Sequence, residues 1–161
     1  MLVKRYLVRS DYSPDDSWRL VEWCRDLGAD EFTVECVSAD DRAADILWQG
    51  LQAVVRPFSH GTRIRDRMSG PTADDLHRPT DLWTLNPDSI SALKKAMPDG
   101  LFEYDPLRGA WLEDPVIYRR EELMLGLLSH EAFAVLRVSE SEAEQLAAAG
   151  FPSHDSLPRI G

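Results

Sequence analysis

The sequence lacks any long apolar run. Its strongest one, Leu123–Leu128, is far too short to cross a bilayer, which takes about 20 residues. At the N-terminus, Leu2 and Val3 are followed at once by Lys4 and Arg5, so the apolar region of a signal peptide is missing. We therefore expect a cytoplasmic protein that does not bind membranes.

Cysteine is scarce as well. Cys24 and Cys36 are the only two, and no second pair or nearby histidine accompanies them, so no zinc site is expected. Without an export signal, both are expected to be reduced thiols. Segment 74–81 contains carboxylates and His77, but no spacing that would bring them together around an ion. We predict a solvated loop there, and neither a metal nor a cofactor.

Basic residues are outnumbered: 18 lysines and arginines stand against 28 aspartates and glutamates, which gives a net charge of -10. Such a surface repels phosphate backbones, so no nucleic-acid partner is expected. It favours encounter with a basic protein partner, although the same charge also simply keeps a protein soluble. Hydrophobic residues make up 43% of the 161, enough for the core of one domain.

The usual linear motifs of catalysis are also missing. His130 lies between Ser129 and Glu131, but no Gly-x-Ser-x-Gly elbow is present, and Ala134 stands where a zinc-protease motif needs its second histidine. Nucleotide-binding glycine loops are absent too. Three polar residues between two apolar, strand-like segments predict a hairpin turn. We predict no catalytic residue and favour a non-enzymatic protein, while noting that a site assembled in space leaves no linear motif.

Helical periodicity accompanies clear capping residues. Ser13 and Asn86 each precede a proline at a first helical position, and Ser139 with Glu142 matches a capping box. Gly28 is suited to end the first of these helices. The predicted helices cover residues 13–27, 40–52, 86–97 and 139–149.

Strand patterns surround these helices. In the second strand, Phe32, Val34 and Cys36 point to one side and their polar neighbours to the other, which predicts a sheet with one wet face. The predicted strands cover residues 2–9, 31–37, 54–57, 101–105, 110–114, 116–119, 122–128 and 132–138. The expected fold is a two-layer α+β arrangement: an N-terminal β-α-β unit, an irregular middle segment, and a C-terminal antiparallel sheet with a capping helix.

One domain is expected over residues 1–151, followed by a loose tail over 152–161. Within the domain, proline and glycine interrupt residues 57–81, which contain few large apolar side chains. We predict an irregular loop there. Loops of this length inside a domain are uncommon and are usually functional or mobile.

An arginine-rich stretch opens that loop and supports an alternative function. A basic island in an acidic protein can hold a phosphate or carboxylate through bidentate guanidinium contacts, and a histidine beside it can carry a proton. The alternative is therefore an enzyme or sensor that binds a small anionic ligand. The same arginines can instead pair with the protein's own carboxylates. The residues concerned are Arg56, His60, Arg63, Arg65 and Arg67.

A predicted acidic hairpin supports the leading function, a non-enzymatic interaction protein of the inhibitor or immunity type. Glu103 and Asp105 are expected to share one face of a strand, with Glu113 on the pairing strand and Trp111 nearby as an aromatic anchor. This face would dock a basic protein partner. A third possibility is a structural subunit that forms a homo-oligomer through a sheet edge or an apolar face.

Overall fold

The computed structural model describes residues 1–38, 59–64, 79–105, 107 and 110–159, together with Arg42, Ile46 and Gln49. Its strands are β1 (Leu2–Val8), β2 (Glu31–Ser38), β3 (Ser59–Ile64), β4 (Pro79–Thr84), β5 (Ala110–Arg119), β6 (Glu122–Leu128) and β7 (Phe133–Ser139). Its helices are α1 (Pro14–Asp26), α3 (Pro87–Ala96) and α4 (Glu140–Ala148), with short 3-10 turns η1 (Arg9–Asp11) and η4 (Ser129–Glu131).

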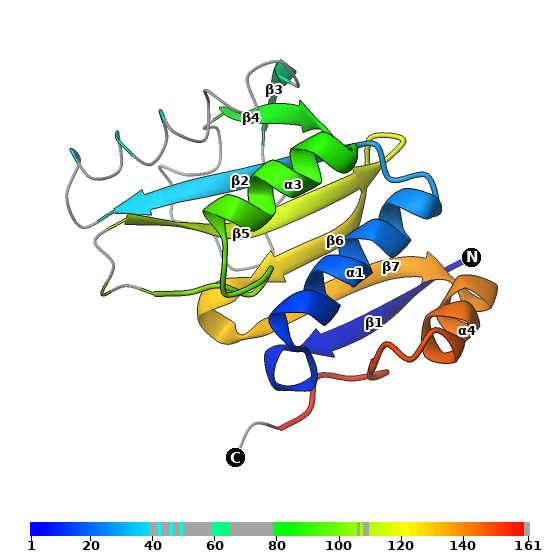
Figure 1. Ribbon diagram of the computed structural model, residues 1–161. Coiled ribbons are helices and arrows are strands. Elements are labelled where there is room, and N and C mark those ends of the chain that lie inside the picture. Colours follow the sequence, from blue (N-terminus) through cyan, green and yellow to red (C-terminus); the bar gives the residue numbers. More distant parts are fainter. Residues whose placement is uncertain are drawn as a thin grey trace.

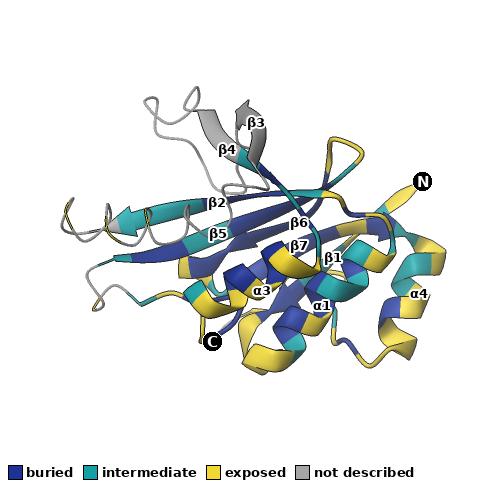
Figure 2. Ribbon diagram, turned by 45° about the horizontal axis from the view of Figure 1, so that its top comes forward, coloured by how far each residue is buried: buried dark blue, intermediate teal, exposed yellow. Residues whose placement is uncertain are grey.

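The strands form one sheet in the order β1-β7-β6-β5-β2-β4-β3, and all neighbours are antiparallel. Because direction alternates across the sheet, β1 and β2 run parallel, and the three strands β7, β6 and β5 lie between them. Helix α1 makes the crossover (Figure 1). Helices α1, α3 and α4 all lie on one side of the sheet (Figure 2). The two-layer α+β fold expected from the sequence is confirmed.

The predicted caps begin the helices. The Ser13 side chain accepts a hydrogen bond from the backbone N–H of Asp16, 3.1 Å away, at the start of α1. Asn86 begins α3 by accepting from the N–H groups of Asp88 and Ser89. These bonds satisfy backbone donors that have no partner inside the helix. The capping box predicted ahead of α4 is also present.

The main core lies between the helices and the sheet. Phe32 and Val34 of β2 point into it. The Phe32 ring packs edge to face on that of Trp83, with 5.2 Å between the ring centroids. The opposite face of the sheet is less exposed to solvent than predicted. Thr33 is 0% exposed, and two further apolar clusters are buried there. These clusters comprise Val116, Tyr118 and Leu123, and Leu128, Phe133 and Val135.

Residues 101–105 do not form the predicted strand. The backbone N–H of Leu101 donates to the Ser17 hydroxyl at 2.9 Å, and that of Glu103 donates to the Gly100 carbonyl at 3.1 Å. The chain therefore turns here instead of pairing with β5. Leu101, Phe102 and Glu103 are all buried, whereas an exposed hairpin would bury alternate residues.

The middle of the chain is not irregular throughout. Strands β3 and β4 pair with each other, and β4 adds to the edge of β2 through Glu31↔Thr84 and Phe32↔Trp83. Gly61 and Pro79 argued for a loop, but Gly61 lies on the edge strand β3 and Pro79 is the first residue of β4, where strands tolerate these residues. The helix expected over 40–52 lies mostly outside the described residues, as does the strand expected over 54–57.

The C-terminal segment is not loose as far as it is described. Tyr6 and His154 exchange two backbone hydrogen bonds of 2.8 Å, so residue 154 pairs with the outer edge of β1. The Arg5 guanidinium donates to Ser153 and forms an ion pair with Asp155. Backbone pairing at an edge strand leaves no signal in the sequence, so this contact could not be predicted.

Candidate acidic centre

The strongest cluster of chemically active groups lies between β2 and β5. Thr33 pairs with Val116, but two residues later Glu35 pairs with Glu113, so β5 contains one extra residue at this point. Asp114 adopts a φ of 50° there, as expected of a β-bulge. The sequence predicted two strands, 110–114 and 116–119, where the structure has one bulged strand.

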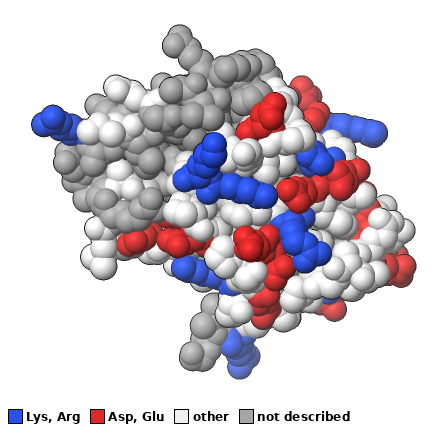
Figure 3. Space-filling view, in the orientation of Figure 1, with Lys and Arg blue, Asp and Glu red and all other residues white. Residues whose placement is uncertain are grey.

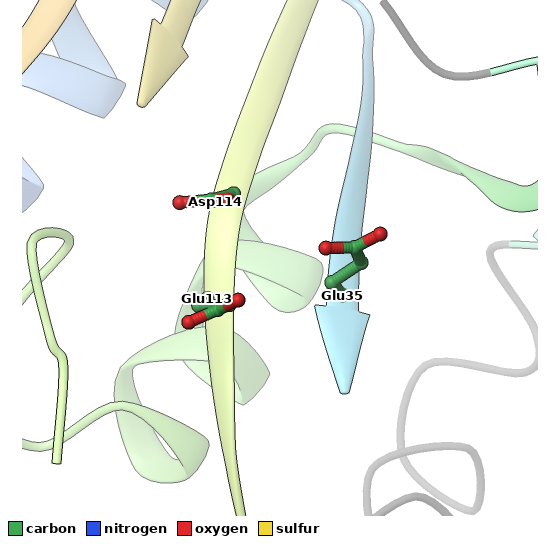
Figure 4. Close-up of side chains that lie close together, drawn as sticks. All are labelled: Glu35, Glu113 and Asp114. Atoms are coloured by element: carbon green, nitrogen blue, oxygen red, sulfur yellow. The ribbon is translucent and has the colours of Figure 1, made fainter. Parts of the chain in front are cut away.

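The bulge brings three carboxyl groups together. Glu113 and Asp114 are successive residues of β5, and Glu35 faces them from β2 (Figure 4). One carboxylate oxygen from each residue lies within 4.8 Å of the other two, and all three side chains are half-buried. We call these three residues the acidic centre. Oxygen groups at this spacing can surround an ammonium or guanidinium group, or a hard metal ion.

Asp114 is held by the β6–β7 turn. The backbone N–H of Ser129 donates to its carboxylate at 2.7 Å, and its own N–H donates to the Ser129 hydroxyl at 3.0 Å. This reciprocal pair fixes the bulge against η4. The turn predicted around His130 is confirmed, and its buried serine serves as a support for the acidic centre.

The environment of Glu113 shifts its pKa. Burial raises its pKa, and so do the neighbouring charges of Asp114 and Glu35. The Trp111 indole N–H, which donates to Glu113 at 3.0 Å, and His130 both lower the pKa, but the net shift is upward. Its carboxyl group therefore holds a proton more strongly than an exposed glutamate.

Aromatic rings border the acidic centre. The Tyr104 ring lies edge-on to Trp111, with 6.0 Å between centroids, and 6.4 Å from the His130 ring. Trp111 is only 7% exposed, whereas Tyr104 is 37% exposed. Tyr104 is thus a ring that a partner can reach, as is His130, whose side chain is 43% exposed.

The residues predicted for partner binding do not all meet. Trp111 and Glu113 are in contact, as expected from their positions on one strand. Asp105 is half-buried and accepts a hydrogen bond from the N–H of Leu107, and Glu103 is 1% exposed and therefore belongs to the interior. Sequence reasoning missed Glu35, which only the pairing of β2 with β5 brings to Glu113, and Asp114, which only the β-bulge places in the same cluster.

The arginine stretch lies largely outside the described part of the chain. Arg56, Arg65 and Arg67 fall outside it altogether. His60 and Arg63 are on β3, where the backbone is described and the side chains are not. The anion site predicted there stays a prediction.

Comparison with known proteins assigns no family to this chain. No family model matches it, and no similar curated protein or solved structure was found. No helix within the described ranges is long and apolar enough to span a bilayer.

Proposed function

We propose that this protein is a non-enzymatic interaction protein, and that its acidic centre binds an arginine or lysine side chain of a basic protein partner. The observation that carries the proposal is the convergence of Glu35, Glu113 and Asp114 within 4.8 Å, beside the exposed ring of Tyr104. The net charge of -10 supports it, because opposite charge speeds the encounter of such partners.

The chemistry of the centre suits a cation better than any other group. A guanidinium group forms paired hydrogen bonds with carboxylates and stacks on aromatic rings, so an arginine would use both the carboxylates and Tyr104. A bound cation would also stabilise the ionised form of Glu113, whose pKa is raised by burial and by its acidic neighbours.

The helix layer is a poorer docking face for a basic partner. Figure 3 views the protein from that side and shows basic and acidic side chains close together across the surface. Lys94 lies 3.3 Å from Glu22, and Arg19 lies 3.0 Å from Asp16. A surface of mixed charge attracts a basic partner less strongly than an area of one sign.

The proposal includes an inhibitor or immunity-type role in the cytoplasm. Both cysteines are free thiols, which fits a reducing compartment. Charge complementarity at an interface gives fast association that weakens as salt rises. The same dependence on salt is expected of this protein and its partner.

The test uses a defined probe: a flexible peptide of alternating arginine and glycine, compared with the same peptide in which citrulline replaces arginine. We expect titration calorimetry to show saturable binding of the arginine peptide alone, weakening as salt rises. Glu113→Gln and the double variant Glu35→Gln/Glu113→Gln should weaken binding about tenfold or more. Glu22→Gln, which removes the same charge from the helix layer, should change the affinity for the arginine peptide by less than about twofold.

Two results would contradict the proposal. Equal weakening by Glu22→Gln and Glu113→Gln would mean that only the overall charge attracts the peptide. Binding of the citrulline peptide with equal affinity would mean that the cation is not what is recognised. The alternative, an enzyme or sensor for a small anion, predicts instead that phosphate or a carboxylate raises the melting temperature, and that Arg63→Ala and Arg65→Ala abolish this effect in a folded protein.

A further inference from the structure

A second candidate site lies on the helix side of the molecule, where β1 leads into α1. A cavity of about 620 Å³ opens there. Its walls come from the end of β1 and η1, from the first turn of α1, from the segment after α3 and from the β6–β7 turn. This volume is within the range of about 300–1,000 Å³ typical of small-molecule sites.

Backbone contacts hold the walls of this cavity in place. The N–H of Arg9 donates to the Ala132 carbonyl at 2.8 Å, which joins η1 to the β6–β7 turn. Gly100 packs so closely on α1 that a Cβ atom there would lie 2.9 Å from the Pro14 Cα atom. The cavity is therefore bounded by segments that cannot easily move apart.

One wall of the cavity is aromatic. The rings of Tyr12 and Phe102 lie 5.8 Å apart at an angle of 34°, and Val8 and Pro14 add apolar surface beside them. The Tyr12 hydroxyl donates to the Pro152 carbonyl at 2.6 Å, which fixes its ring. A flat or branched apolar group would be buried favourably against this wall.

Two residues of opposite charge, both exposed, border the same cavity. Within the described part of the chain, neither the Arg9 guanidinium nor the Asp99 carboxylate takes part in an ion pair or a side-chain hydrogen bond, and both residues border the cavity. Nearby acidic groups differ in this respect: Asp11 pairs with His154 at 2.8 Å, and Asp16 with Arg19 at 3.0 Å. The cavity thus offers one cation and one anion to a ligand.

We propose that this cavity binds a small zwitterion with an apolar side group, namely a free amino acid with an aromatic or large aliphatic side chain. Its carboxylate would be held by Arg9 and its ammonium group by Asp99, with the side chain on the Tyr12–Phe102 wall. A simple anion would leave Asp99 as a repulsive neighbour, and a simple cation would meet Arg9 in the same way. A zwitterion satisfies both. This proposal does not depend on the acidic centre.

The experiment compares three probes that share a phenyl ring. L-phenylalanine carries both charges, 3-phenylpropionate only the carboxylate, and 2-phenylethylamine only the ammonium group. We expect thermal shift and titration calorimetry to show saturable binding of L-phenylalanine, and at least about tenfold weaker binding of each single-charge probe. Absence of saturable L-phenylalanine binding below about 10 mM, or equal binding of a single-charge probe, would overturn the proposal.

Variants of the protein test whether Arg9 binds the carboxylate of the ligand and Asp99 its ammonium group. Arg9→Gln should weaken the binding of L-phenylalanine and 3-phenylpropionate but not that of 2-phenylethylamine. Asp99→Asn should weaken the binding of L-phenylalanine and 2-phenylethylamine but not that of 3-phenylpropionate. Ser10→Trp, which places a large side chain at the cavity wall, should abolish binding of all three. The matched controls Arg137→Gln and Asp26→Asn, on exposed positions away from the cavity, should leave binding unchanged. Indistinguishable behaviour of the cavity variants and these controls would refute the site.

Discussion

Arg119, at the end of β5, forms a bidentate pair with Glu142 in the first turn of α4, with nitrogen-to-oxygen distances of 2.6 and 3.2 Å. The same Glu142 carboxylate accepts the N–H of Ser139 at 2.9 Å in the capping box of α4. Arg119 also donates to the carbonyl of Leu27, at the end of α1. One arginine thereby joins the sheet to two helices.

Loss of this pair should weaken the fold. We expect Glu142→Gln to lower the free energy of unfolding at pH 7 by about 1–3 kcal/mol, because a charge-assisted pair at a partly buried site is lost. Glu144→Gln, on an exposed position of the same helix, should change it by less than about 0.5 kcal/mol. Urea unfolding measures both. Equal effects of the two substitutions would contradict the role given to Glu142.

The contribution of Glu142 should depend on pH. Hydrogen bonds from Arg119 lower its pKa in the folded protein. A carboxyl group with a lowered folded pKa contributes stability above its unfolded pKa, and the contribution is lost as pH falls through the folded value. Urea unfolding at pH 7 and pH 3 should therefore show the difference between wild type and Glu142→Gln shrinking in acid. A difference that is the same at both pH values would disprove this.

The contribution of Glu113 to stability should depend on pH in the opposite direction. Burial, with the charges of Asp114 and Glu35, raises its pKa, so the folded protein favours the neutral acid. Stability from this group is present below its unfolded pKa and is lost as pH rises through the raised folded value. Glu113→Gln keeps an oxygen acceptor for Trp111 and removes the charge. It should raise the melting temperature at pH 7 and leave it nearly unchanged at pH 4. A lower melting temperature at pH 7 would contradict the electrostatic account.

Gly100 should tolerate no side chain. Its φ is 99°, and an added Cβ would lie 2.9 Å from both the Pro14 Cα and the Ser17 hydroxyl oxygen. We expect Gly100→Ala to destabilise the protein by more than about 2 kcal/mol, from backbone strain and from the clash. Gly150 also has a positive φ but no atom within 4 Å of the added Cβ. Gly150→Ala should therefore lower the free energy of unfolding by only about 1 kcal/mol, as measured by thermal unfolding. An equal loss of stability at both positions would show that the clash at Gly100 does not contribute.

The two thiols should differ in reactivity. Cys24 is fully buried, and burial raises its pKa to about 12, so almost no thiolate forms at neutral pH. Cys36 is half-buried on β2. A disulfide reagent added to the native protein should modify one thiol per chain, and the second only after unfolding. Cys36→Ser should abolish the native reaction; its persistence would show that Cys24 is accessible.

Elements built from local interactions could be predicted from the sequence. The caps of α1, α3 and α4 lie within three residues of the groups they bind, so they are readable in order along the chain. The hairpin turn at His130 was readable in the same way. The strand predicted over 101–105 was wrong because the hydroxyl of Ser17, far away in the sequence, binds that backbone. The candidate site was only half predicted, since Trp111 and Glu113 share a strand while Glu35 does not.

The sequence by itself determined helices α1, α3 and α4, most of the described strands, the two-layer α+β class and the acidic charge, because periodicity, capping and composition act between near neighbours or over the whole chain. Only the tertiary structure decided which carboxylates meet at the acidic centre, where the tail pairs with β1, and which charges line the cavity. The first depends on strand order and on a one-residue bulge, and the other two depend on which distant segments pack against β1 and α1. Contacts between residues distant in the chain are selected by the packing of the complete fold, which no local pattern records.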